Sequence, residues 1–402
     1  MSTFLRSPIQ DYLIELHRQF SGVHDGAVAD YIPQLKSADP DAFGIALVTV
    51  DGHVYQVGDT QLPFTIQSMS KPFTYGMALE RHGIEYVQQK VGMEPSGEAF
   101  NSISLDPGSG RPRNPMINAG AIASSGMIEG DGLDSRLQNI LDAYERYVGS
   151  KLELDESVYK SESETGHRNR AIGHMLRNFD ILEEDPEETL ELYFKQCAIS
   201  LNCRDLAMMA ATLSNGGVNP ITSVRALNEK YVEKVLSVMS SCGMYDYAGS
   251  WIYEVGLPAK SGVSGGILAI LPGQLGLAIY SPRLDEKGNS FRGIQVCKQV
   301  SRDFDLHMLN SRSLTASVIR AQYDANAVRS KRVWPTEIRA KLDEQGASIK
   351  VWELHGDLVF GSTEFVLANI MASLNDTSHV ILDLKRVFNI NPAASRLLTD
   401  LA

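Results

Sequence analysis

The sequence predicts an α+β protein in which an antiparallel sheet with a large helical insert is followed by a small α/β unit. Two early segments, 43–50 and 54–58, and two late ones, 267–271 and 275–280, have the composition and length of strands. Most apolar residues between these pairs recur at helical spacing. The 402 residues exceed the usual length of one compact domain, so a second folded unit is expected.

The first part opens with a predicted helix, because apolar residues from Ile9 to Phe20 recur at helical spacing. The two early strands form a hairpin around the turn Asp51-Gly52-His53. From Ser68 to about Ser240 the pattern is mainly helical, with glycine-rich and proline-rich breaks between helices. A further helix is expected from about Gly293 to Leu309, after the late strands.

The second part begins where the composition becomes polar and basic. We expect a first domain at 1–309, a linker at 310–345 and a small unit at 346–402. The elements predicted for the small unit are strand Ser348–Leu354, turn His355-Gly356-Asp357, strand Leu358–Gly361, helix Thr363–Ser373, strand His379–Leu384 and a helix after Asn391. This order leaves the sheet incomplete, so either the chain is truncated or a partner completes the unit.

Composition excludes several classes of function. Acidic residues outnumber basic ones by 49 to 37, which gives a net charge of −12 and argues against nucleic acid as a partner. No apolar run is long enough to span a bilayer, and Met1 to Gln10 lacks the apolar core of a secretory signal, so we expect a cytoplasmic protein. The four cysteines form no CxxC pair and the histidines no metal motif, so we expect reduced thiols and no metal.

The chemistry is concentrated in an SxxK motif. Ser68 and Lys71 lie one helical turn apart, so the lysine amine can reach the serine hydroxyl. Pro72 requires the helix to begin at about Ser68. A nucleophile at a helix N-terminus lies among unpaired N–H groups that stabilise a developing oxyanion.

A second motif strengthens this interpretation, since SxxK alone recurs by chance. Lys260-Ser261-Gly262 follows roughly 190 residues later and directly precedes the late strand pair. The combination resembles the SxxK and KTG elements of serine β-lactamases and penicillin-binding DD-peptidases, which also have a helical insert between the two motifs.

The resemblance becomes specific over about Tyr12 to Leu309, where six blocks in the same order look like the glutaminase family of this fold. They are Ala29 to Leu35, Gln67 to Pro72, Asn114 to Ala121, Ser161-Glu162 with Arg168-Asn169, Ser241 to Asp246, and Pro258 to Val263. The resemblance implies hydrolysis of the side-chain amide of L-glutamine to L-glutamate and ammonia, without a metal or organic cofactor.

The resemblance also implies individual roles. Ser68 is the nucleophile, Lys71 its activator and Tyr245 a proton shuttle, while the N–H groups of Ser68 and Val263 form the oxyanion hole; Lys260 is the lysine of the second motif. The substrate-binding residues are Tyr31, Gln67, Ser68, Asn118, Glu162, Asn169, Tyr193, Tyr245 and Val263.

The residue types are chemically consistent with those roles. Glutamine presents an ammonium, which Glu162 suits, and a carboxylate, which Asn118, Asn169 and Tyr31 suit. Without the family context each would have a plainer interpretation: Glu162 as a solvated helix residue, the tyrosines as core residues and Asn118 as part of a tight turn.

The segment from Ile349 onward resembles a STAS domain in Val380 to Leu384 and Val387 to Ala394. That likeness implies a scaffold or a protein contact, and we expect a homo-oligomer, either a dimer or a tetramer. Two rival functions stay open: a hydrolase or peptidase of the same fold that interacts with β-lactams, and a non-catalytic signalling protein.

Overall fold

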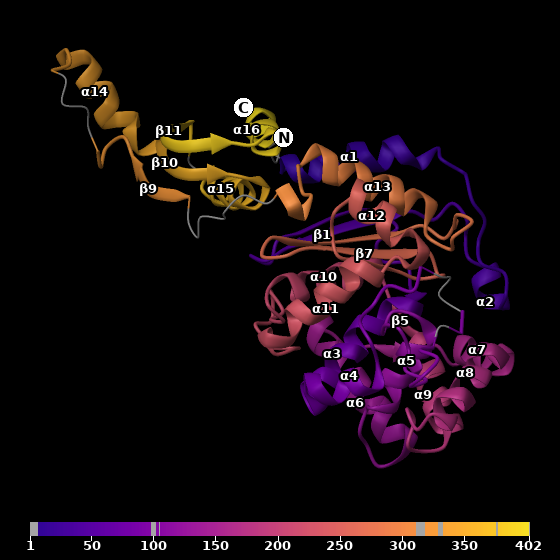
Figure 1. Ribbon diagram of the computed structural model, residues 1–402. Coiled ribbons are helices and arrows are strands. Elements are labelled where there is room, and N and C mark those ends of the chain that lie inside the picture. The colour runs from indigo at the N-terminus through magenta and orange to yellow at the C-terminus, as the bar shows by residue number, and fades with distance from the viewer. Residues whose placement is uncertain are drawn as a thin grey trace. The chain divides into compact units, whose positions relative to one another are not determined.

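The computed structural model describes residues 7–97, 102–103, 105–310, 318–328, 333–374 and 377–401 (Figure 1). The chain forms two compact units. The larger comprises Leu13–Gln299, and the smaller combines the described residues of 1–12 with those of 300–402.

A five-stranded antiparallel sheet organises the larger unit, in the order β2-β1-β8-β7-β6. The strands are β1 (Gly44–Thr49), β2 (Val54–Gly58), β6 (Ala259–Ser261), β7 (Gly266–Leu271) and β8 (Leu275–Tyr280). The pairing of β1 with β8 runs from Gly44 opposite Tyr280 to Thr49 opposite Leu275, so the two ends of the unit meet at the centre of the sheet. The predicted α+β class, the early hairpin and the late strands are confirmed.

Helices fill the interval between β2 and β6. They are α3 (Lys71–His82), α4 (Ile84–Lys90), α5 (Asn118–Gly126), α6 (Gly132–Val148), α7 (Glu156–Thr165), α8 (His167–Asn178), α9 (Pro186–Cys197), α10 (Cys203–Ser214), α11 (Glu229–Cys242) and α12 (Ala248–Glu254), while the short helix α2 (Pro33–Lys36) precedes β1. Two further helices flank the unit, α1 (Pro8–Ser21) and α13 (Phe291–Asp303). The predicted opening helix is confirmed, while the helix expected to reach Leu309 ends at Asp303.

Helix α10 packs directly on the central strands of the sheet, and α12 lies on the opposite side (Figure 1). A capping box fixes the start of α10: the Asp205 N–H donates to the Asn202 side chain at 2.9 Å, and the Asp205 carboxylate accepts from the Asn202 N–H. Contact between helix and strand depends on Gly276 in β8, where an added Cβ would lie 2.2 Å from the Ala211 nitrogen.

A second, short sheet fixes the segment that precedes the SxxK motif. Its order is β3 (Phe64–Thr65), β5 (Ile199–Leu201) and β4 (Glu153–Leu154). The Ile66 N–H continues the pairing by donating to the Ile199 carbonyl at 2.8 Å. The chain therefore enters the motif from a backbone position that is held by the strand directly after α9.

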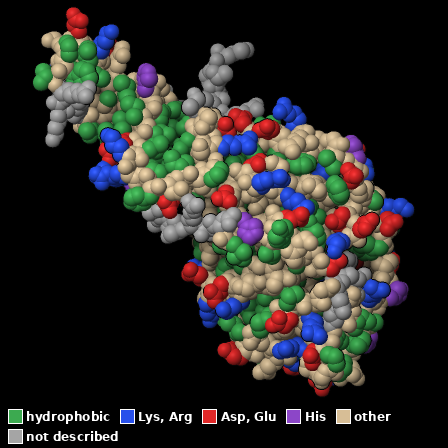
Figure 2. All heavy atoms as spheres, turned by 45° about the horizontal axis from the view of Figure 1, so that its top comes forward, with side chains coloured by type: hydrophobic (Ala, Val, Ile, Leu, Met, Phe, Trp, Pro, Cys, Tyr) green, Lys and Arg blue, Asp and Glu red, His purple; other side chains and the backbone are tan. Residues whose placement is uncertain are grey.

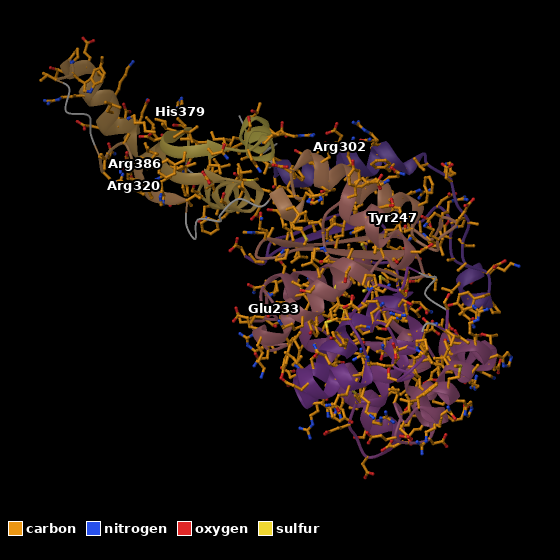
Figure 3. All side chains as sticks on the ribbon, viewed as in Figure 1. Glu233, Tyr247, Arg302, Arg320, His379 and Arg386 are labelled. Carbon is orange, nitrogen blue, oxygen red and sulfur yellow. The ribbon has the colours of Figure 1, made fainter. Side chains whose placement is uncertain are left out.

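The smaller unit contains a three-stranded sheet with β10 at its centre. Its elements are β9 (Ile319–Asp324), α14 (Thr336–Gln345), β10 (Ile349–Leu358), α15 (Phe360–Ala372), β11 (His379–Ile390) and α16 (Pro392–Leu401). Strand β10 pairs in parallel with β11 and antiparallel with β9. Arg320 on β9, labelled in Figure 3, forms an ion pair with Glu353 on β10.

Two predictions for this unit are wrong. The expected turn at 355–357 is part of continuous strand β10, since Gly356 accommodates a register shift with φ of 79° instead of reversing the chain. The expected strand at 358–361 is cut short because α15 begins at Phe360. The segment expected to be a linker contains β9 and α14, and its residues 311–317 and 329–332 lie outside the described part of the chain.

No helix in the described part of the chain combines the length and apolar character of a bilayer crossing. Cys197, Cys203, Cys242 and Cys297 are buried and have free thiols. On the face of the larger unit seen in Figure 2, acidic and basic side chains are interspersed.

Gly276 provides a test of the packing between the sheet and α10. Gly276→Ala should destabilise the protein by about 3 kcal/mol, because its Cβ meets backbone atoms that cannot move without shifting α10. Thermal unfolding should show a fall in Tm of roughly 5–10 °C. Gly249→Ala, whose Cβ meets nothing within 4 Å, is the matched control. An unchanged Tm for Gly276→Ala would contradict the close contact.

Candidate active site

The predicted nucleophile lies in a strained turn at the start of a helix. Gln67–Ser70 form a 3₁₀ turn that continues directly into α3, with Pro72 in the first helical turn. The backbone of Gln67 has a φ of 50°, a left-handed conformation that residues other than glycine rarely adopt. Ser68 follows immediately and is 8% exposed. The helix therefore begins close to the predicted position.

Lys71 is buried, and its amine donates hydrogen bonds to two neutral acceptors. Its Nζ donates to Asn118 Oδ1 at 2.7 Å and to the Met116 carbonyl at 3.1 Å. Burial lowers the pKa of Lys71 from 10.5 to about 7. Asn118 is the first residue of α5, and Gly120 allows that helix to approach the Asn114 carbonyl, which an added Cβ would meet at 1.9 Å.

The lysine of the second motif lies beside the same tyrosine as Lys71. Lys260 Nζ is 3.9 Å from the centroid of the Tyr245 ring, and Lys71 Nζ is 5.5 Å from it. Burial lowers the pKa of Lys260 well below its usual value, and the charge of Lys71 lowers it further. Lys260 also donates to the Ser261 carbonyl at 2.7 Å. The two buried amines and the phenol form one cluster.

Tyr245 stays protonated near neutral pH. Burial raises its pKa, and a hydrogen bond with the Ser68 side chain acts in the opposite direction. Its backbone also has a positive φ, 54°. The following residue but one, Tyr247 (labelled in Figure 3), donates to Glu254 at 2.7 Å, and Lys298 pairs with the same carboxylate at 2.7 Å. These bonds hold the turn that presents Tyr245.

Glu162 is a buried acceptor on α7. The Tyr31 hydroxyl donates to its Oε1 at 2.7 Å and Gln67 Nε2 donates to the same oxygen at 3.2 Å. Burial raises the pKa of Glu162, while these two donors work in the opposite direction. At 8% exposed it is not the solvated helix residue of the plainer interpretation. Two of the predicted binding residues thus orient a third.

An amide chain lines the other side. Asn118 Nδ2 donates to Asn169 Oδ1 at 2.9 Å, and the Tyr193 hydroxyl donates to Asn118 Oδ1 at 3.4 Å. Asn118 Oδ1 therefore accepts from both Tyr193 and Lys71. The carbonyl end of Asn118 is fully engaged, which fixes its amide orientation.

These side chains surround one cavity of about 310 Å³. Its lining comprises Tyr31, Gln67, Ser68, Asn118, Glu162, Thr165, Gly166, Arg168, Asn169, Tyr193, Phe194, Cys197 and Val263. Lys71 and Tyr245 adjoin it through Asn118 and Ser68. The site prediction omitted five of the lining residues, although Phe194 and Cys197 follow Tyr193 at helical positions that could have suggested them.

This arrangement suits acyl transfer. A serine hydroxyl, a lysine whose amine is partly neutral near pH 7 and a protonated tyrosine lie together beside a cavity with one buried carboxylate. No group of three or more His, Cys, Asp or Glu side chains in the described ranges is placed to hold a metal ion.

Comparisons with known proteins point to one family. Residues 26–309 match the glutaminase family model. The chain is 48% identical to glutaminase 2 of Bradyrhizobium diazoefficiens over 398 residues, which are 98% of this chain, and it spans 63% of that relative's length. It is 54% identical to the glutaminase of Trichormus variabilis over 75% of this chain and 90% of that protein. The solved structure of Mglu in its glutamate form is 37% identical, with a TM-score of 0.76 over 98% of this chain and 95% of that one.

The buried amine of Lys71 should titrate far below an exposed lysine. In protein with ¹³C-labelled lysine side chains, the signal that disappears in Lys71→Met should have a midpoint near pH 7, because burial disfavours the ammonium. Exposed lysines such as Lys151 in the same sample are the internal control. A midpoint above pH 9 for the Lys71 signal would contradict the proposed environment.

Proposed function

The chain belongs to the glutaminase family, and on that premise we propose that it hydrolyses the side-chain amide of L-glutamine through an acyl-enzyme on Ser68. The observation that carries this proposal is that Ser68 and the buried carboxylate of Glu162 line one cavity, which Lys71, an amine with a lowered pKa, adjoins. Mglu, a relative over nearly the whole chain, has been solved in a glutamate form.

The cavity distinguishes the two ends of the substrate. Glu162 accepts the α-ammonium, and its two donors, Tyr31 and Gln67, fix the direction of its free lone pairs. The Asn169 and Asn118 amides and the Tyr193 hydroxyl form the polar wall for the α-carboxylate. The side-chain amide then extends to Ser68.

The first chemical step is attack of Ser68 Oγ on the amide carbon. Lys71 accepts the hydroxyl proton, because its amine is neutral in a large share of molecules near pH 7. The N–H groups of Ser68 and Val263 bind the oxyanion. Ser68 lies at the start of a helix, and Val263 lies in a tight turn in which the Gly265 N–H donates to the Gly262 carbonyl at 2.9 Å.

The second step is loss of ammonia. Tyr245, held protonated by burial, donates a proton to the leaving nitrogen and recovers one from Lys71. The carbon–nitrogen bond breaks, and the γ-glutamyl ester of Ser68 remains. Water, deprotonated by the same groups, hydrolyses the ester to glutamate. Lys260 restricts the Tyr245 ring, whose centroid lies 3.9 Å from its Nζ.

The cavity disfavours the first rival function. Both L-glutamine and a β-lactam present a carboxylate, but the buried carboxylate of Glu162 calls for a cationic partner, which the α-ammonium of glutamine supplies and the β-lactam ring system does not. The non-catalytic alternative leaves the lowered pKa of Lys71 beside Ser68 without a purpose.

Four further features stay as proposals. The larger unit has a serine β-lactamase-like fold, since its sheet and helical insert have the predicted order. The unit at 346–402 is STAS-like and serves protein contacts. The chain forms a homo-oligomer, either a dimer or a tetramer. Its location is the cytoplasm.

Removal of the nucleophile tests the proposal. Purified chain, without added metal, should release ammonia and glutamate from L-glutamine in equal amounts. Ser68→Ala should lower kcat by about 10⁴-fold or more, because no acyl-enzyme can form. Ser124→Ala, which removes a buried hydroxyl that donates to the Gly120 carbonyl of its own helix at 2.8 Å, is the matched control. An inactive parent, or full activity in Ser68→Ala, would refute the proposal.

Substrate length tests the binding arrangement. Asparagine is one methylene shorter, so its amide cannot reach Ser68 while its ammonium stays on Glu162. We expect kcat/KM for asparagine to be lower by at least about 100-fold, the usual effect of a misplacement of this size. Comparable values for the two amino acids, measured by ammonia release, would contradict the placement of Glu162 as the ammonium acceptor.

A further inference from the structure

A buried chain of polar side chains connects the strained turn before the nucleophile to two helices of the cavity wall. Ser70 Oγ donates to the Gln67 carbonyl at 2.7 Å, and Gln196 Nε2 on α9 donates to Ser70 Oγ at 2.9 Å. Ser125 Oγ on α5 then donates to Gln196 Oε1 at 3.1 Å. Ser70, Gln196 and Ser125 are each 0% exposed.

The chain joins the elements that supply the cavity. The 3₁₀ turn supplies Ser68 and Gln67, α9 supplies Tyr193, and α5 supplies Asn118. Figure 1 shows α3, α5 and α9 in the same helical part of the larger unit, and α9 contacts the 3₁₀ turn. None of the three linking side chains lines the cavity, so they cannot touch substrate.

Gln67 gives this connection a function beyond packing. Its φ of 50° persists only if surrounding contacts hold it, and the Ser70 hydroxyl binds the carbonyl of that same residue. The Gln67 side chain donates to Glu162, while its carbonyl carbon is bonded to the Ser68 nitrogen. A relaxed Gln67 would displace the ammonium acceptor and the nucleophile together.

We propose that Ser70 and Gln196 are positioning residues, which hold Gln67 in its strained conformation and thereby align Glu162 and Ser68. The inference rests on the proposed function. Three hydrogen bonds hold Ser70 in position: the two of its hydroxyl and one that the Tyr144 hydroxyl donates to its carbonyl at 2.9 Å. The Gln196 amide connects the two serines, because its Nε2 donates to Ser70 and its Oε1 accepts from Ser125.

Single and double variants separate positioning from stability. Ser70→Ala leaves the Gln196 donor without its partner, so it should lower Tm. Gln196→Leu removes the donor to the Ser70 hydroxyl and one of the two acceptors of the Ser125 hydroxyl, which still donates to the Ala121 carbonyl at 3.0 Å, so it should also lower Tm. The double variant Ser70→Ala/Gln196→Leu replaces both polar groups by apolar ones, which should recover part of the lost Tm. If the residues position Gln67, activity should not recover with it.

The experiment measures kcat and KM for L-glutamine well below the Tm of each variant. We expect kcat/KM of Ser70→Ala and of the double variant to fall by about 10- to 100-fold, with KM raised and kcat lowered, because both Glu162 and Ser68 shift. Ser70→Thr, which retains the hydroxyl, should recover most of the activity. Ser124→Ala, beside Ser125 on α5, is the matched control and should be fully active.

The outcomes distinguish the two proposals. An active parent with an equally active double variant would overturn the positioning role and leave the proposed function intact. A double variant whose activity recovers in parallel with its Tm would show a merely structural role. An inactive parent would overturn both.

Discussion

Burial of the Lys71 amine is the constraint on which the rest of the site depends. Asn118 Oδ1 and the Met116 carbonyl, which accept its hydrogen bonds, are both neutral, so neither offsets the cost of desolvating an ammonium as a carboxylate would. The pKa consequently falls to about 7, where the amine can accept a proton from Ser68. The same environment holds Lys260, whose lowered pKa reflects burial and the proximity of Lys71.

The surrounding fold can be understood as the support for that burial. The pairing of β1 with β8 closes the sheet, and β6 extends from it with Lys260. The contact between α5 and the Asn114 segment, which Gly120 permits, places Asn118 on Lys71. Gln67 and Tyr245 both have positive φ, and their side chains reach Glu162 and Ser68, respectively.

Sequence predicted the parts of this structure that local periodicity determines. Local sequence patterns predicted the early hairpin and the late strands, and both appear in the structure. They also predicted that Ser68 and Lys71, three residues apart, lie near the start of one helix. The smaller unit was predicted less well, because a glycine inside a strand has the same signature as a turn, and Gly356 is such a glycine. Strand β9 was missed because the polar and basic composition of its surroundings indicated a linker, although Ile319, Ala321 and Tyr323 alternate with polar residues as in a half-buried strand.

The sequence predicted many residues of the candidate site but not the hydrogen bonds that connect them. Motif resemblance identified the residues around the cavity, yet no sequence pattern indicates that Tyr31 and Gln67 share one oxygen of Glu162, or that Gln196 reaches Ser70 across 126 positions. Such contacts depend on how α5, α7 and α9 pack, and each is between residues far apart in the chain.

The central claim is that a γ-glutamyl ester forms on Ser68, and the most direct test is to trap it. An acid quench of the parent protein during turnover of L-glutamine stops hydrolysis of the ester. The quenched protein, analysed by peptide mass spectrometry, should carry one γ-glutamyl group on the peptide that contains Ser68. The group should disappear when Ser68 is replaced by alanine. Turnover without any such adduct, or an adduct on a different residue, would contradict the account.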